Sequence, residues 1–278
     1  MGASTDLIPV YCDVLTHVHS VFPHNPTCAG RQTVAEVMAM AAAFGAGGVA
    51  FTEHTSDPAA PAQAAAKWLL SAFSEQSRLV HETVVQQPDS HSLRCWSGAE
   101  VNILPGGHPD VDEGELHDLA SYVVASQHGG LGVTEKDPAA IVERLAHVCS
   151  FDGVDTLGHP SRYNDECDVD WVTVFARAAA TNTAVEVNFN LWFTKGPGRG
   201  RFRVGNDIWY DGQLAFWRNW LLALANSGAP VVVGLDIHNT GMWPLAGPTW
   251  KHFCYCWQKP AFHPTELLVA RLSYSASG

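Results

Sequence analysis

Residues 10–19 read VYCDVLTHVH, a mostly apolar stretch that ends in His17 and His19. Similar short apolar runs, closing on or near a polar side chain such as His, Glu or Asp, recur at 48–54, 95–104, 121–128, 154–159, 184–190 and 230–238. Most are followed by a helical pattern, at 33–44, about 61–85, from Pro138 onward, about 169–180 and about 213–226. Strands that alternate with helices indicate parallel βα units. About seven such units in 278 residues favour an α/β fold with a closed (β/α) barrel, and an open sheet is the alternative.

The domain organisation follows from the absence of dividing segments in the sequence. No repeat, charge block or long Gly/Ser linker interrupts residues 1–278, so we expect a single barrel domain. Two stretches do not fit the alternation: a basic, aromatic insert at about 192–212 and an irregular segment at about 241–278. Both follow strand ends, where the loops of a barrel build active sites.

Composition excludes several classes of function. The 16 Lys and Arg against 28 Asp and Glu give a formal charge of −12, so we expect no binding to long nucleic acids. We find neither a signal peptide nor a transmembrane run of about 20 apolar residues, so we expect no membrane association. Seven cysteines without a framework spacing predict reduced thiols and a cytoplasmic location.

Histidines and carboxylates gather at the ends of the predicted strands. His17 and His19 are two residues apart on one strand, which predicts side chains on the same face. Six further residues close or nearly close later runs: His54, Glu100, His128, His159, Asp236 and His238. A lone histidine at a strand end is more often exposed or hydrogen-bonded, but the joint pattern is harder to explain that way. The carboxyl ends of barrel strands converge on one mouth, so we expect all eight residues to share one pocket.

These pieces, taken in order, resemble a known family. The segments are THVHS at 16–20, His24, FTEH at 51–54, GAEVN at 98–102, SQH at 126–128, GHP at 158–160 and GLDIH at 234–238. Their order and spacing resemble the PHP (polymerase and histidinol phosphatase) superfamily of metal-dependent phosphoesterases. The resemblance covers about residues 10–240. It implies a distorted (β/α)7 barrel that holds two to three divalent metal ions at the C-terminal ends of its strands.

The resemblance also implies which residues bind each metal. The first metal would be held by His17, His19, Glu100 and Asp236, with Glu100 bridging to the second. His128 and His159 would complete the second site, and His24, His54 and His238 the third. Two positions depart from the family pattern: Leu15 stands where an Asp is frequent, and Glu53 where an Asp is usual.

The chemistry of this ligand set agrees with phosphate ester hydrolysis. Imidazole and carboxylate ligands suit Zn, Fe or Mn, and water between two bridged cations loses a proton near neutral pH. We therefore expect hydrolysis of a small-molecule phosphomonoester by a metal-bridging hydroxide, with Glu100 and Asp236 as catalytic residues. Three divalent ions against these two carboxylates would give a local charge of about +4, which attracts phosphate although the whole chain is acidic.

Several other residues are candidates for contacts with the substrate. Arg162 follows the His159 segment and is expected to contact phosphate or, equally, to form a surface salt bridge. His108 would protonate the leaving group, unless it is an ordinary exposed loop residue. The insert supplies a group of candidate substrate-binding cations: Lys195, Arg199, Arg201 and Arg203. The insert could be a lid, a solvated loop or a subunit contact, and the oligomeric state is left open. Three tryptophans in predicted loops could stack on the organic part of a substrate: Trp192, Trp209 and Trp243.

Three other functions remain as alternatives. The same site could serve a phosphodiesterase acting on a small nucleotide. A barrel amidohydrolase cutting C–N or C–O bonds would share the His-x-His and the late Asp. Many amidohydrolases bridge their metals with a carboxylated lysine, however, and none of the five lysines here closes a predicted strand. A metal-binding module without catalysis is the last alternative, and the near-complete ligand set argues against it.

Overall fold

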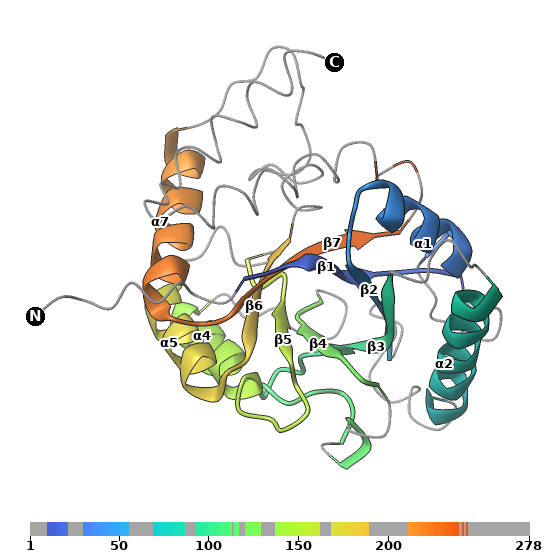
Figure 1. Cartoon of the computed structure of the whole chain (residues 1–278). Coiled ribbons are helices and arrows are strands. Elements are labelled where there is room, and N and C mark those ends of the chain that lie inside the picture. The colour runs from blue at the N-terminus through green and yellow to red at the C-terminus, as the bar shows by residue number, and fades with distance from the viewer. Residues whose placement is uncertain are drawn as a thin grey trace, which may run out of the picture.

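Seven parallel strands close into a barrel in the computed structural model, with helices on the outside (Figure 1). The structure describes residues 10–21, 30–55, 69–86, 93–112, 114–116, 120–128, 137–161, 168–188, 211–238, 241 and 243. The strands are β1 (Val10–Val18), β2 (Gly48–His54), β3 (Arg94–Asn102), β4 (Val123–Ser126), β5 (Thr156–Gly158), β6 (Ala184–Asn188) and β7 (Val231–Ile237). Each strand pairs with the next, and β7 pairs with β1. The predicted (β/α)7 barrel is thus confirmed, and the open sheet is excluded.

The helices that the structure describes match the predicted ones, apart from the starts of α2 and α7. They are α1 (Val34–Ala43), α2 (Leu69–Gln86), α4 (Pro138–Val148), α5 (Trp171–Thr181) and α7 (Asp211–Ser227). In Figure 1, α1 and α2 lie beside β2 and β3, whereas α4, α5 and α7 lie on the opposite side of the barrel. The first part of the helix expected from about residue 61 lies outside the described residues. Because α7 begins at Asp211, the last two residues of the predicted insert belong to a helix.

Side chains at the helix starts explain where two of these helices begin. The hydroxyl of Thr33 accepts a hydrogen bond from the backbone N of Glu36 (3.2 Å), and the Glu36 carboxylate accepts one from the backbone N of Thr33 (2.7 Å). At the start of α5, Asp170 accepts a hydrogen bond from the backbone N of Thr173 (3.2 Å). These caps satisfy backbone N–H groups that have no partner inside the helix. They fix the positions of the helices that pack against the barrel.

The apolar core lies between the strands and the helices. On one side, the rings of Trp171 and Phe175 from α5 contact Trp220 from α7, with the centroids of Phe175 and Trp220 5.1 Å apart. On the other side, Val37 and Met38 of α1 are fully buried in the same core. Helix packing therefore covers the outer face of the barrel, and residues on the inner face are free to be polar. No helix in the described part of the chain is long and apolar enough to cross a membrane.

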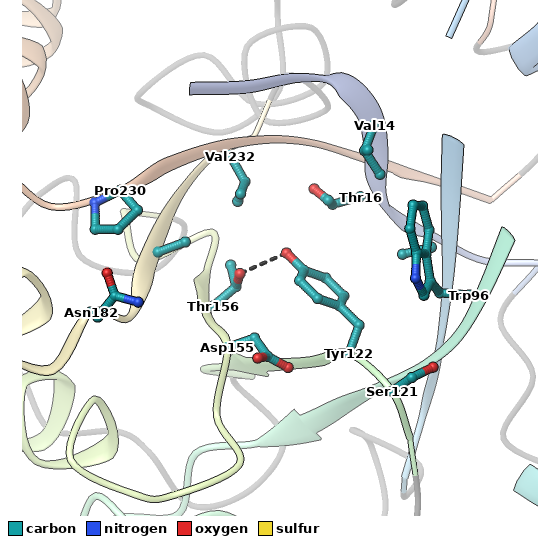
Figure 2. Close-up of a pocket in the computed structure, with 12 residues that line it drawn as sticks. Val14, Thr16, Trp96, Ser121, Tyr122, Asp155, Thr156, Asn182, Pro230 and Val232 are labelled. Atoms are coloured by element: carbon teal, nitrogen blue, oxygen red, sulfur yellow. Dashed lines mark hydrogen bonds between the residues drawn. The ribbon is translucent and has the colours of Figure 1, made fainter. Parts of the chain in front are cut away.

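The two mouths of the barrel differ in what they contain. At the N-terminal ends of the strands, a cavity of about 300 Å³ is lined by residues that include Val14, Trp96, Tyr122 and Thr156 (Figure 2). Inside it, the hydroxyl groups of Tyr122 and Thr156 form a hydrogen bond of 2.6 Å. None of the predicted metal ligands that the structure describes lines this cavity. They lie at the other mouth, at the C-terminal ends of the strands.

Gln32 joins the ends of β1 and β7 beside that second mouth. Its buried amide donates hydrogen bonds to the carbonyl oxygens of His19 (2.9 Å) and Ile237 (3.1 Å), and accepts one from the indole N–H of Trp243 (2.9 Å). Trp243 is fully buried and stacks on Phe44 of the α1 cap, with ring centroids 5.8 Å apart. The expectation that Trp243 stacks on a substrate is therefore wrong, because this ring belongs to the core.

Replacing Gln32 tests how much this connection stabilises the barrel. Gln32→Met removes the hydrogen bonds to the carbonyls of His19 and Ile237 and to the buried indole N–H of Trp243, and a buried group left unpaired costs about 1–3 kcal/mol. We expect the free energy of unfolding of the metal-free protein to fall by roughly that amount, measured by urea unfolding with circular dichroism. Gln86→Met, at the exposed end of α2, is the matched control and should change the stability by less than about 0.5 kcal/mol. Equal stability of the two variants would contradict the contribution of Gln32.

Candidate metal centre

Glu100 lies at the centre of the residues that gather at the C-terminal mouth. It comes from β3, and only 1% of it is exposed. Its Oε1 atom lies 3.0 Å from His17 Nε2, 3.1 Å from His159 Nε2 and 3.4 Å from His128 Nε2. One oxygen of a single carboxylate thus faces imidazoles from β1 and from the segments that follow β4 and β5.

The other oxygen of Glu100 faces a different set of residues. Its Oε2 atom lies 2.9 Å from His54 Nδ1 and 3.4 Å from His19 Nε2. His19 Nε2 is also 3.4 Å from Asp236 Oδ1, which in turn lies 2.8 Å from His238 Nε2. The ring of His19 stacks on the rings of His54 and His238, with centroids 4.7 and 4.4 Å apart.

All eight residues expected to share one pocket are therefore brought together by the structure. This holds although they come from separate strands and span most of the chain. His24, the ninth residue of the predicted ligand set, lies outside the described residues. The function of these side chains as metal ligands stays a prediction.

The end of β1 differs from the regular strand that the spacing of His17 and His19 predicted. The pairing of β1 shifts register between Leu15 and Val18 against β2, and again between Thr16 and Val18 against β7. At this irregularity, His17 has a positive φ of 60°. Simple alternation is therefore not why the two rings face Glu100. The bulge itself directs the His17 ring, as bulges next to active sites often do.

A set of outer residues that the sequence analysis did not assign orients the histidine rings. Asn102 Oδ1 accepts a hydrogen bond from His128 Nδ1 (2.6 Å), and the Asn102 amide donates to Asp110 (2.7 Å). The carboxylate of Glu186 lies 2.8 Å from His17 Nδ1. With the Nδ1 proton held in this way, the Nε2 lone pair of each ring points toward Glu100, which is the arrangement found around metal-binding histidines.

The two departures from the family pattern have local consequences. Leu15 is 1% exposed and belongs to the apolar core, so this position offers no carboxylate to His17. Glu53 accepts a hydrogen bond from the backbone N of Ser20 (2.5 Å) and lies 3.6 Å from His19 Nδ1. Glu53 thus contacts residues at the end of β1.

Burial and charge act against each other in this cluster. Burial raises the pKa of the Glu100 carboxyl, but His17, His54 and His128 outweigh it and hold that pKa well below its usual range. Burial lowers the pKa of His17, but Glu100 and Glu186 raise it well above the usual value. For His19, the nearby carboxylates of Asp236 and Glu53 similarly overcome burial and raise the pKa to about 9. Burial and the neighbouring His19 and His128, in contrast, lower the pKa of His54, although Glu100 raises it.

The residues present fit divalent metal ions. Three groups place their ligand atoms within 4.8 Å of one another: His17 with His19 and Asp236, His17 with Glu100 and His159, and His19 with His54 and Glu100. Buried atoms without a hydrogen bond in the described structure include His17 Nε2, both ring nitrogens of His19 and Glu100 Oε2. Buried polar atoms are normally satisfied, so an unmet lone pair at such a point is typical of a metal ligand.

The remaining predicted site residues are not part of the cluster that the structure describes. His108 is exposed, and its ring lies 4.8 Å from His147 and 5.3 Å from Phe151, between centroids. The structure therefore does not bring His108 to the metal centre, and we assign it no proton transfer. Arg162 and the four cations of the insert (Lys195, Arg199, Arg201 and Arg203) lie outside the described residues.

Comparisons with known proteins agree with the geometry. No family model matches the sequence. A probable phosphatase of Syntrophotalea carbinolica is 28% identical over 188 residues, which cover 67% of this chain and 69% of that protein. The DNA polymerase/3'-5' exonuclease PolX of Bacillus subtilis is 29% identical over 157 residues, which cover 54% of this chain and 23% of that protein.

A solved structure with the same barrel completes these comparisons. The crystal structure of histidinol phosphate phosphatase from Lactococcus lactis, in complex with zinc, L-histidinol and phosphate, superposes with a TM-score of 0.55. It covers 91% of this chain and 95% of the other, at 15% identity, and so supports the fold. Together with the barrel, these two relatives support a metal-dependent phosphoesterase of the PHP superfamily. The predicted ligand residues of this chain that the structure describes lie at the mouth where barrel enzymes carry out their chemistry.

Replacing Glu100 tests whether one carboxylate connects the predicted metal sites. Glu100→Gln keeps the shape but removes the charge that both oxygens present to the imidazoles. We expect at least two metal ions per chain to be lost together and hydrolysis to fall by more than 100-fold, measured by elemental analysis and phosphate release. His81→Ala, on an exposed position of α2, is the matched control and should change neither quantity. Near-normal turnover by Glu100→Gln would contradict the bridging function.

Proposed function

We propose that this PHP protein hydrolyses a small-molecule phosphomonoester with the help of two or three divalent metal ions. One observation carries the proposal: the two oxygens of the buried Glu100 carboxylate face two different sets of imidazoles. A carboxylate in this position can bridge two cations, which is the arrangement of two-metal phosphatases. The position is held by a glutamate rather than by the carboxylated lysine found in many amidohydrolases, so the amidohydrolase alternative has less support.

The cluster divides into three sets of ligands under this proposal. The first cation would be held by His17, His19, Glu100 and Asp236, the second by Glu100, His128 and His159, and the third by His54 and His238 with His24. When bound, Zn, Fe or Mn ions would stabilise charge on phosphoryl oxygens and lower the pKa of water enough to supply hydroxide near neutral pH. Imidazole and carboxylate donors without thiolates suit these metals.

The chain's own residues contribute orientation and charge. Glu186 and Asn102 hold the Nδ1 sides of His17 and His128, which leaves Nε2 of both rings directed inward. Glu100 stays ionised in its buried position, because the surrounding rings hold its pKa far below neutral. We propose that Arg162 binds the phosphate of the substrate by two parallel hydrogen bonds, the geometry that arginine favours with phosphate. Phosphoryl transfer needs little more than such positioning and charge stabilisation.

Metal content and substrate class can be measured on one sample of the full chain. We expect two to three Zn, Fe or Mn ions per chain after purification without chelator, and phosphate release from small phosphomonoesters. Treatment with a strong chelator should abolish release, and adding back one of the three metals should restore it. Bound metal together with no release from any monoester would contradict the proposed reaction. No bound metal after reconstitution would contradict the metal centre itself.

A phosphodiesterase acting on a small nucleotide is the second candidate. One matching relative is named as a DNA polymerase and exonuclease, and the match covers 54% of this chain and 23% of that protein. The formal charge of −12 disfavours a long polymeric substrate but not a dinucleotide. Including dinucleotides and a chromogenic diester in the same panel separates the candidates, since a phosphatase should prefer the monoesters by at least 100-fold.

The basic insert supplies a separate prediction about substrate binding. We propose that Arg199 and Arg201 contact the substrate, together with Lys195 and Arg203. Changing Arg199 and Arg201 to Ala should raise KM for the preferred substrate by about 30-fold, because each of the two lost charge contacts is worth about 1 kcal/mol. KM for a small chromogenic monoester should change less than twofold. Equal changes for both substrates would contradict a substrate-binding insert.

A further inference from the structure

We propose that Glu186 is a positioning residue that fixes His17 and His159 together, and that Gly234 is the residue that makes space for it. The inference rests on the proposed metal centre but concerns a residue outside its ligand set. Glu186 is in β6, and 1% of it is exposed. Its two oxygens contact residues from two other strand ends, so one side chain connects parts of the centre that are distant in sequence.

The contacts of Glu186 account for both carboxylate oxygens. Oε1 lies 2.8 Å from His17 Nδ1, and Oε2 accepts a hydrogen bond from the backbone N of His159 at 2.6 Å. The amide of Asn188 also donates to Oε2, at 3.2 Å. Glu186 therefore forms hydrogen bonds with the ring of His17 and with the backbone of His159. The ring nitrogens that face Glu100, Nε2 of both histidines, remain on the inner side.

Backbone strain explains why these two histidines need to be held. His17 has a φ of 60° and His159 a φ of 25°, values that residues with a side chain rarely adopt. Strained conformations of this kind persist only where the surrounding structure determines them, and they concentrate at functional sites. Both strained residues contact the same carboxylate. Loss of that carboxylate would let both backbones relax and move their Nε2 atoms away from Glu100.

Gly234 of β7 lies directly against this carboxylate. A Cβ atom at position 234 would overlap the carboxylate group of Glu186. Gly234 is not among the glycines with positive φ, so its backbone does not itself require glycine. The missing side chain is needed for space, and that space is filled by Glu186. The motif GLDIH at 234–238 thus supplies the predicted ligands Asp236 and His238 and also, at Gly234, the space that the Glu186 carboxylate occupies.

The first test measures metal affinity instead of activity. Zn²⁺ affinity of the chelator-treated full chain is determined by competition with a chromophoric chelator, and folding is checked by circular dichroism. Glu186→Gln keeps the volume but removes the negative charge, and should weaken Zn²⁺ binding by about 10- to 100-fold, as for other residues that orient metal-binding histidines. Thr156→Val, a near-isosteric change inside the barrel at the opposite mouth, is the control and should stay within about twofold (Figure 2).

The outcomes separate this inference from the proposed function. Zn²⁺ binding by Glu186→Gln at wild-type affinity would overturn the positioning function and leave the metal centre intact. Equal weakening in Thr156→Val would also overturn it, because the effect would then be a general loss of stability. A wild-type chain that binds no Zn²⁺ would overturn the metal centre, and the inference with it.

A double substitution tests the pairing with Gly234. In the wild-type background, Gly234→Ala should weaken Zn²⁺ binding about as much as Glu186→Gln, because the new Cβ displaces the carboxylate. In a Glu186→Ala background the space is empty, and the same Gly234→Ala change should cause less than a twofold further loss. A full additional loss in the double variant would mean that the two positions act independently, and would overturn their coupling.

Discussion

Glu100 carries a negative charge in a place where its side chain hardly meets water, and a buried carboxylate without compensation is very costly. The barrel compensates it with imidazoles from several strands, which approach both oxygens to within 2.9–3.4 Å. This constraint links the strand ends to one another, because each ring must arrive at the same point. The closed order of the strands makes such an arrangement possible, since all seven carboxyl ends face one mouth.

The same constraint appears in the backbone. In the described part of the chain, four residues other than glycine have a positive φ, and three of them belong to the cluster: His17, His159 and Asp236. The fourth, Asn182, ends α5, where a left-handed residue is ordinary. Strain is thus concentrated in the ligand set and offset by well-packed surroundings, such as Gln32 across the ends of β1 and β7. The geometry of the site is maintained at some cost to local stability, as at many functional sites.

The sequence predicted the barrel and the meeting of the eight residues because both depend on strong local signals. Apolar runs mark the strands, and a polar residue at the end of a run marks the mouth. The residues that orient the rings carry no such signal. Glu186 sits in the ordinary alternation of residues 184–188, AVEVN, and its partner His17 is 169 positions away. Alternation of side chains assumes a regular strand, so it does not predict the bulge at His17. The burial of Trp243 is not visible in the sequence because its hydrogen-bond acceptor, Gln32, is distant along the chain.

The buried acids that the structure reveals also change the charge balance of the proposed site. The sequence suggested two carboxylates against three divalent ions, which leaves about +4. The structure adds Glu53 beside His19 and Glu186 beside His17, so four carboxylates contact the predicted ligands. Two divalent ions would then only neutralise the cluster, whereas three would leave a charge of about +2. Attraction of a phosphate dianion to the proposed metal centre of this acidic chain therefore depends on the third metal ion. His54 and His238, which would bind that ion, thus contribute to substrate attraction as well as to metal binding.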